Sequence, residues 1–154
     1  MVWYLPEAIT MGHRVFTAVS ILMFSLAGMA LAEAADVMVY KSPTCGCCKK
    51  WVEHMRDNGF TVKARDMADV TPYKARYGVT PELASCHTAV VDGYVLEGHV
   101  PAADVKRLLR ERPRIAGLSA PGMPASSPGM DSGHEPYDVL SFDKEGNIAV
   151  YAKH

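Results

Sequence analysis

The sequence predicts one α/β domain whose elements follow the order β-α-β-α-β-β-α. Two observations carry this prediction. A cluster of three cysteines separates a short β-branched run, residues 36–41, from residues 48–58, whose apolar positions repeat at helical spacing. Further along, two apolar runs flank Asp92 and Gly93, and this pattern is a strong signal for a hairpin with a two-residue turn.

The next elements follow from local end signals. The helix after the cysteines is expected to end at Asn58 and Gly59, because glycine accepts the left-handed conformation that stops helices. Residues 60–64 are predicted as a second strand, which a right-handed crossover should join to the first. A short helix is expected to begin at Thr71 and Pro72, since proline suits the first turn of a helix.

The hairpin is predicted to have strands at residues 88–91 and 94–97. A last helix is predicted between residues 100 and 113, where the apolar residues form one stripe and a proline ends the pattern. This is the element order of a thioredoxin core, and the cysteine cluster lies where that fold carries its redox pair.

Residues 116–136 differ in composition from the rest of the domain. Glycine, proline and serine dominate, and Pro-Gly-Met occurs at residues 121–123 and again at residues 128–130. A structureless stretch of about 20 residues in a small domain is usually a functional lid or a linker. We expect a Pro/Gly/Met-rich loop there, followed by an extra C-terminal hairpin over residues 138–151.

Residues 15–32 are a nearly uninterrupted apolar run that follows a basic residue and ends in small residues. This layout predicts a signal peptide over residues 1–34 and a mature periplasmic domain, residues 35–154, without membrane association. Residues 1–10 do not resemble the start of a signal peptide, so Met11 is an alternative start and these residues a start-site artefact. A retained membrane anchor is the alternative, because the run approaches the length of about 20 residues that spans a bilayer.

Composition and motifs give no support to several classes of function. A formal net charge of −1 gives no indication of a nucleic-acid partner, and no motif of a hydrolase is recognisable.

In an oxidising compartment, four cysteines usually form two structural disulfides. Every such pairing would use the three clustered cysteines, and a ring that closes so little chain adds little stability, so this interpretation is disfavoured.

Cys45, Cys47 and Cys48 form a Cys-x-Cys-Cys motif at the predicted start of a helix. Cys45 and Cys48 are three residues apart, so their sulfurs share one face of the first turn. A dithiol redox pair needs only these two sulfurs. Three thiolates suit a soft metal, because sulfur ligands select Cu(I) or zinc. The helix start, with Lys49 and Lys50 nearby, should favour thiolates over thiols.

Residues 40–48, 85–93 and 98–101, together with the two Pro-Gly-Met tripeptides, resemble one known family. These are the periplasmic thioredoxin-like Cys-x-Cys-Cys metal-binding proteins that include the copper-resistance protein CopG. The similarity extends from about residue 36 to residue 151. It implies a thioredoxin-like fold, a copper site on the cysteine motif, a part in periplasmic copper resistance and a copper redox activity proposed for its members.

One departure from ordinary thioredoxins adds a fourth sulfur. Where they carry a cis-proline before the third strand, this sequence has Cys86 and His87. We interpret Cys86 as a metal ligand rather than as a resolving thiol. Four sulfurs could form the closed set that is typical of structural zinc. Because adjacent Cys47 and Cys48 cannot easily both point at one ion, we favour bridging thiolates in a small polynuclear Cu(I) site.

Two methionines and two histidines are additional candidates. Met123 and Met130 offer neutral thioethers that bind Cu(I) without deprotonation, or they only fill gaps in the loop. His87 and His99 are expected at strand ends that border the cysteine helix, as ligands or as hydrogen-bonded structural histidines. His54 is expected to be a solvated helix residue.

The favoured hypothesis is an exported copper-binding protein of copper resistance, with copper ions and other periplasmic copper-handling proteins as its partners. Its metal ligands would be Cys45, Cys47, Cys48 and Cys86, joined by Met123, Met130, His87 and His99. Copper redox activity would make it a copper oxidoreductase. The alternative is a thiol-disulfide oxidoreductase in which Cys45 attacks and Cys48 resolves. A third hypothesis is a copper chaperone that passes its ion to an efflux system.

Overall fold

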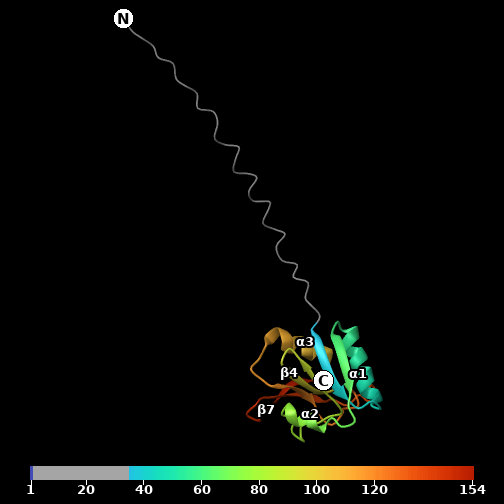
Figure 1. Ribbon diagram of the computed structural model, residues 1–154. Coiled ribbons are helices and arrows are strands. Elements are labelled where there is room, and N and C mark those ends of the chain that lie inside the picture. The colour runs from blue at the N-terminus through green and yellow to red at the C-terminus, as the bar shows by residue number, and fades with distance from the viewer. Residues whose placement is uncertain (2–34) are drawn as a thin grey trace. The chain divides into compact units, whose positions relative to one another are not determined.

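The computed structural model describes Met1 and residues 35–154 of the 154-residue chain, so the predicted signal peptide lies outside the described residues. From residue 36 to residue 111 the elements occur in the order expected from the sequence (Figure 1). They are β1 (Asp36–Lys41), α1 (Gly46–Asp57), β2 (Thr61–Asp66), α2 (Thr71–Arg76), β3 (Thr88–Val91), β4 (Tyr94–Gly98) and α3 (Ala102–Glu111). Three strands follow, β5 (Gly117–Ala120), β6 (Asp138–Phe142) and β7 (Ile148–Lys153).

The described strands form one mixed seven-stranded sheet in the order β2-β1-β3-β4-β5-β6-β7. β1 pairs with β2 in parallel, through the crossover that contains α1, and with β3 in the antiparallel direction. β3 and β4 form the predicted hairpin, and Asp92 and Gly93 both have positive φ (48° and 86°) in its turn. This conformation matches the right-handed twist of the two strands, which explains why the Asp-Gly signal was reliable.

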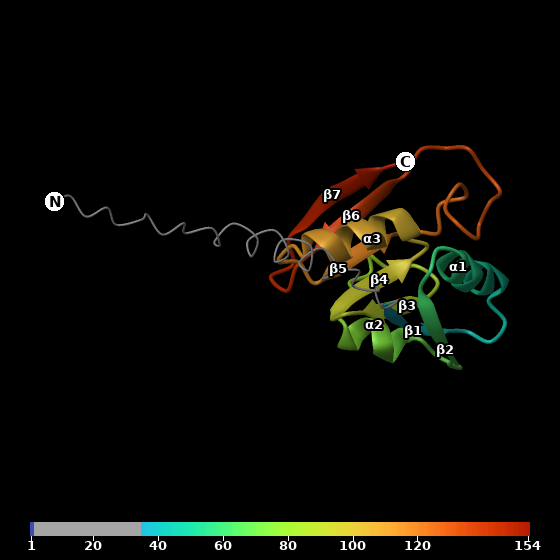
Figure 2. The same ribbon diagram turned by 90° about the horizontal axis from the view of Figure 1, so that it is seen from above.

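α1 and α3 cover one face of the sheet, and α2 lies on the other (Figure 2). The first face holds the main core, in which Trp51 and Met55 of α1 meet Leu108 of α3 and the strands. Burial of each such side chain contributes about 1.5–3 kcal/mol. Because neighbouring strand residues point to opposite faces, Leu96 belongs to this core while Val95 belongs to a smaller cluster on the other face.

The structure corrects the beginning of the predicted loop. Residues 117–120 are not irregular but form β5, which pairs in parallel with β4 and antiparallel with β6. Leu118 and Ala120 are fully buried in the main core. This strand lacks β-branched residues and has no propensity signal of its own, so its conformation comes from its two neighbours in the sheet. Through β5, the predicted C-terminal hairpin of β6 and β7 joins the central sheet.

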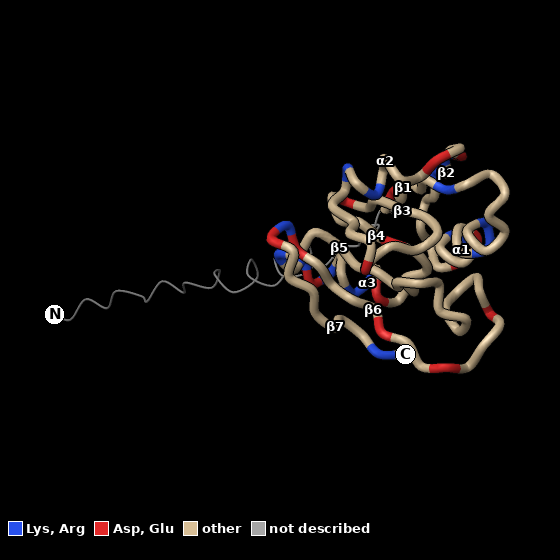
Figure 3. The backbone as a smooth tube through the Cα atoms, turned by 90° about the horizontal axis from the view of Figure 1, so that it is seen from below, with Lys and Arg blue, Asp and Glu red and all other residues tan. Residues whose placement is uncertain are grey.

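The remainder of the predicted loop connects β5 to β6 along the side of the molecule where α1 lies. It carries Asp131 and Glu135 but no lysine or arginine, whereas charges of both signs occur on α1, on α3 and in the turn between β6 and β7 (Figure 3). Among the described residues, no helix is long and apolar enough to cross a membrane.

Candidate metal centre

The first turn of α1 is built around the cysteine motif. Cys45 is the N-cap residue, with extended backbone, and its Sγ accepts a hydrogen bond from the Cys48 amide at 3.3 Å. The Cys45 amide donates to the Ser42 carbonyl at 3.2 Å and closes the turn before the helix. Sulfur therefore occupies the position that a serine or aspartate oxygen usually takes at a helix start. The helix dipole there favours negative charge on sulfur.

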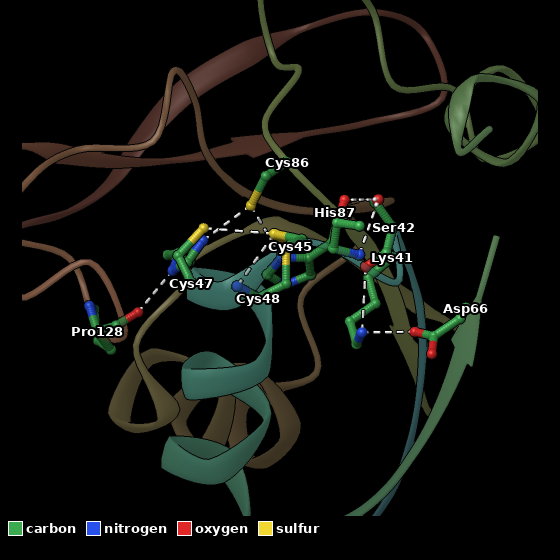
Figure 4. The surroundings of a disulfide bond; sticks show 11 residues. Lys41, Ser42, Cys45, Cys47, Cys48, Asp66, Cys86, His87 and Pro128 are labelled. Carbon is green, nitrogen blue, oxygen red and sulfur yellow. Dashed lines mark hydrogen bonds and ion pairs between the residues drawn. A yellow bond between two sulfur atoms is a disulfide. The ribbon is translucent and has the colours of Figure 1, made fainter. Parts of the chain in front are cut away.

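Cys45 and Cys48 are joined by a disulfide, whereas Cys47 and Cys86 are free thiols (Figure 4). All four cysteines lie within the described residues, and the two-disulfide framework considered above is not formed among them. The bonded pair is the one that a thiol-disulfide exchange reaction would use. For all four sulfurs to bind a metal, this disulfide must first take up two electrons and two protons and become two thiols.

Cys86 reaches the motif from a distant part of the chain, the segment just before β3. Its thiol points toward the first turn of α1 (Figure 4), and the sulfurs of all four cysteines lie within 4.8 Å of one another. Burial raises the pKa of the Cys86 thiol to about 12, and neighbouring Cys47 adds to this effect. The fold thus brings the four cysteine sulfurs together, as the metal-site hypothesis requires.

Two fully buried histidines extend the sulfur cluster. The Cys86 sulfur lies 2.9 Å from Nε2 of His99 and 3.3 Å from Nδ1 of His87. Together with Cys48, these residues form a second group whose potential ligand atoms lie within 4.8 Å of one another. The Nε2 atom of His87 is buried without a hydrogen-bond partner. Burial lowers the pKa of both imidazoles, which keeps them in the neutral form that binds metals.

A buried carboxylate supports the segment that carries Cys86. Glu97 of β4 is fully buried and accepts the Ser85 amide at 2.6 Å on one oxygen and the Thr88 hydroxyl at 2.7 Å on the other. Lys74 of α2 forms an ion pair with the same carboxylate. Burial raises the pKa of Glu97, and the lysine and hydrogen bonds oppose this change. One side chain thus binds the residues on both sides of two candidate ligands, Ser85 through its backbone amide and Thr88 through its hydroxyl.

The loop between β5 and β6 contacts the site through its backbone. The carbonyl of Pro128 accepts a hydrogen bond from Nδ1 of His99 at 2.7 Å. Gly129 is buried against α1, and a Cβ atom at this position would lie 2.8 Å from the Trp51 amide nitrogen and 3.0 Å from the Cys47 carbonyl oxygen. The second Pro-Gly-Met tripeptide therefore packs directly on the cysteine helix.

The two candidate thioethers differ in their surroundings. Met130 follows Gly129 and is half-buried, whereas Met123 is 43% exposed. The first Pro-Gly-Met tripeptide lies close to the segment before Cys86, since the Gly122 amide donates to the Ala84 carbonyl at 3.2 Å. Both tripeptides thus contact segments that carry candidate ligands, and the role of the methionines as ligands stays a prediction.

His54 differs from the sequence-based expectation of a solvated side chain. It is half-buried, and its Nε2 accepts the amide hydrogen of Ala102, the first residue of α3, at 3.1 Å. Sequence reasoning also missed the support that Glu97 gives to the site. Neither role has a sequence signal, because each pairs an ordinary helix or strand residue with a partner that only the folded chain brings near.

Comparisons with known proteins place these features in a family. Two solved structures are described as forms of copper resistance protein copG. Form 2 matches with 42% sequence identity and a TM-score of 0.75, over 79% of this chain and 99% of that chain. Form 1 matches with 43% identity and a TM-score of 0.74, over 79% and 98%. The chain belongs to the CopG family.

A second comparison covers a shorter segment of this CopG-family chain. A family described as proteins of unknown function, DUF411, matches residues 83–130. That segment contains Cys86, both buried histidines and both Pro-Gly-Met tripeptides, but not the Cys-x-Cys-Cys motif. No curated protein matches the chain.

Proposed function

We propose that this CopG-family chain is an exported, periplasmic copper-binding protein of copper resistance. The observation that carries the proposal is the position of Cys86, whose sulfur lies within 4.8 Å of the three sulfurs of the cysteine motif. Thiolates favour soft ions such as Cu(I). The structural relatives described as copper resistance proteins favour copper over zinc as the ion.

The ligands require the reduced protein. Once a thiol reductant has supplied two electrons and two protons to the disulfide, four thiols are available. The proposed ligands are Cys45, Cys47, Cys48 and Cys86, with His87, His99, Met123 and Met130 as additional donors. Adjacent cysteines favour thiolates that bridge two ions, so we propose a small polynuclear Cu(I) cluster. Because imidazole also accepts Cu(II), the mixed donor set supports copper redox activity.

We also propose that the first seven elements form a thioredoxin-like core. The strand order β2-β1-β3-β4, with β1 and β2 parallel and the other two pairs antiparallel, supports this assignment. So does the position of the cysteines at the start of the helix that connects β1 to β2.

The disulfide between Cys45 and Cys48 favours a second candidate function, thiol-disulfide exchange. It is a Cys-x-x-Cys pair at a helix start, where the helix dipole favours the nucleophilic thiolate form of a cysteine. In that reaction the Cys45 thiolate attacks a substrate disulfide, and the Cys48 thiolate then displaces the reduced substrate. Cys47 has no part in this sequence of steps, so it separates the two functions.

The test compares Cys47→Ser with wild type in anaerobic titrations of the reduced protein with Cu(I), alone and in competition with Zn²⁺. Bound metal per chain and accessible thiols are counted at each point. We expect wild type to take up more than one copper ion with protection of its thiols, and the variant to lose most of that capacity. Preferential zinc binding would overturn the proposal. So would full copper uptake by the variant, accompanied by undiminished reduction of a disulfide substrate.

A further inference from the structure

The second Pro-Gly-Met tripeptide forms a turn whose own hydrogen bond does not use the Pro128 carbonyl. The Met130 amide donates to the Ser127 carbonyl at 3.0 Å, and Gly129, in the third position of this turn, has a φ of 86°. Proline in the second position and positive φ in the third are the signature of a type II turn. The turn's own hydrogen bond uses the carbonyl of Ser127, so the carbonyl of Pro128 is available to another donor.

That other donor is the imidazole of His99. A carbonyl oxygen can only accept a hydrogen bond, so the 2.7 Å contact to Nδ1 requires the proton to be on Nδ1. In the neutral ring, Nε2 then carries a lone pair and no proton. This atom faces the Cys86 sulfur at 2.9 Å, where it can accept the thiol hydrogen or bind an ion.

We propose that the loop acts on the metal centre as a positioning device, in which the Pro128 carbonyl fixes His99 in the Nδ1–H form and directs Nε2 at Cys86. The inference rests on the proposed function for its metal-binding consequence, whereas the tautomer is a property of the metal-free protein. This role of the loop differs from metal ligation by Met130, because it depends on the hydrogen bond between the Pro128 backbone carbonyl and His99. Hydrogen-bond partners of this kind orient a ligating histidine and raise its basicity.

The packing of Gly129 holds the carbonyl in place. A methyl group at this position would meet the backbone of Trp51 and Cys47 in α1, so any larger residue must lift the turn from the helix. Gly122 occupies the same position in the first Pro-Gly-Met tripeptide. It has a similar φ of 68°, but a methyl group there would have no atom within 4 Å. Alanine strains the backbone at both positions, because both φ values are positive, but we expect only Gly129→Ala to displace the Pro128 carbonyl.

The experiment compares wild type, Gly129→Ala and Gly122→Ala. The ¹⁵N shifts of the His99 ring nitrogens in metal-free protein, at about pH 8, distinguish a protonated nitrogen from a bare one. We expect the Nδ1–H tautomer of His99 to predominate in wild type and in Gly122→Ala. In Gly129→Ala, we expect it to be no longer the major form. Cu(I) affinity in competition with a chelator should then fall about 10- to 100-fold in Gly129→Ala relative to Gly122→Ala.

The outcomes separate this inference from the proposed function. If His99 is in the Nε2–H form in wild type, the inference is overturned. This measurement needs no variant, so it tests the inference even if Gly129→Ala does not fold. An unchanged tautomer in folded Gly129→Ala, or an equal change in both variants, overturns it as well. Normal copper affinity in a Gly129→Ala protein that has lost the Nδ1–H form removes the consequence for the metal. Absence of copper binding in wild type, with the Nδ1–H form present, removes the proposed function and leaves the positioning contact established.

Discussion

The Thr88 hydroxyl donates a 2.7 Å hydrogen bond to the carboxylate of Glu97, and both side chains are fully buried. The same carboxylate accepts the Ser85 amide and pairs with Lys74. One charged group therefore satisfies three donors next to the candidate ligands. Loss of this acceptor would leave buried donors unpaired. The desolvation penalty of an unpaired buried donor exceeds the net free energy that one hydrogen bond contributes to folding.

We expect Glu97→Gln to lower the free energy of unfolding by about 2–4 kcal/mol, because the amide has no charge for Lys74 and cannot accept from all three donors. The Lys74 side chain is 14% exposed, so water partly solvates its charge in the variant and reduces the loss of stability. Urea unfolding measures the change in the free energy of unfolding. Asp36→Asn is the control, since it breaks an ion pair whose side chains are 63% and 61% exposed, and it should cost less than about 1 kcal/mol. Equal losses in the two variants would contradict the buried role of Glu97.

Cys86 should react slowly with alkylating reagents in the folded, metal-free protein. Burial raises its pKa to about 12, and only the thiolate reacts. At about pH 8, the reactive fraction is then roughly one part in ten thousand, and alkylation should be about a thousandfold slower than for an ordinary cysteine. The rate should increase about tenfold with each pH unit. Mass spectrometry after iodoacetamide treatment measures it, with the urea-unfolded protein as reference. Equal rates in both states would disprove the shift.

His54 should make the fold sensitive to mild acid. Burial lowers the pKa of His54 below 6.5, and the neutral ring accepts the amide of Ala102 at the start of α3. The folded state therefore binds this proton more weakly than the unfolded chain does. Its contribution to stability is complete above about pH 6.5 and decreases as the pH falls toward the folded pKa. The lowered pKa values of His87 and His99 act in the same direction.

For His54→Ala we expect a loss of about 1 kcal/mol in the free energy of unfolding at neutral pH, as for a helix start without its acceptor. The further loss between neutral pH and about pH 5 should be smaller than in wild type, because one of the three histidines no longer contributes. Urea unfolding at the two pH values gives both quantities. His134→Ala, at an exposed position, is the control variant. An unchanged pH dependence in His54→Ala would rule out this account.

The two methionine sites provide a matched pair for copper binding. Met130 is half-buried beside the residue that packs on α1, and Met123 is 43% exposed. Leucine conserves the volume and removes the sulfur. We expect Met130→Leu to weaken Cu(I) binding about tenfold and Met123→Leu to weaken it less, with little change in melting temperature for either. Competition with a Cu(I) chelator measures the affinities. Wild-type affinity in both variants would exclude thioether ligation.

Where sequence patterns are local, they predicted the fold well. Val37 and Val39 in β1, the cysteine helix and the Asp92–Gly93 turn each depend on neighbours within a few residues. β5 could not be predicted in this way, because its Gly-Leu-Ser-Ala sequence has no strand preference and is extended only between β4 and β6.

The candidate site divides along the same line. Cysteines and histidines can be recognised by their residue type, and the position of Cys86, where ordinary thioredoxins carry a cis-proline, suggested that it lies near the motif. The Pro128 carbonyl could not be recognised, because every residue has one. Glu97 was equally hidden, since a charged residue in a hairpin strand is normally exposed and its burial depends on Lys74 of another element.

The proposed metal centre would also have a consequence for the lifetime of the molecule. Its sulfurs come from α1 and from the segment before β3, so an ion held between them is a reversible cross-link between distant parts of the polypeptide. The unfolded chain keeps only the three neighbouring sulfurs of the cysteine motif, so binding at the proposed site would add at most about 4 kcal/mol of stability when the free ion exceeds its dissociation constant a thousandfold. On the proposed function, resistance to heat and to proteases increases with free copper, and the protein persists longest when copper is abundant.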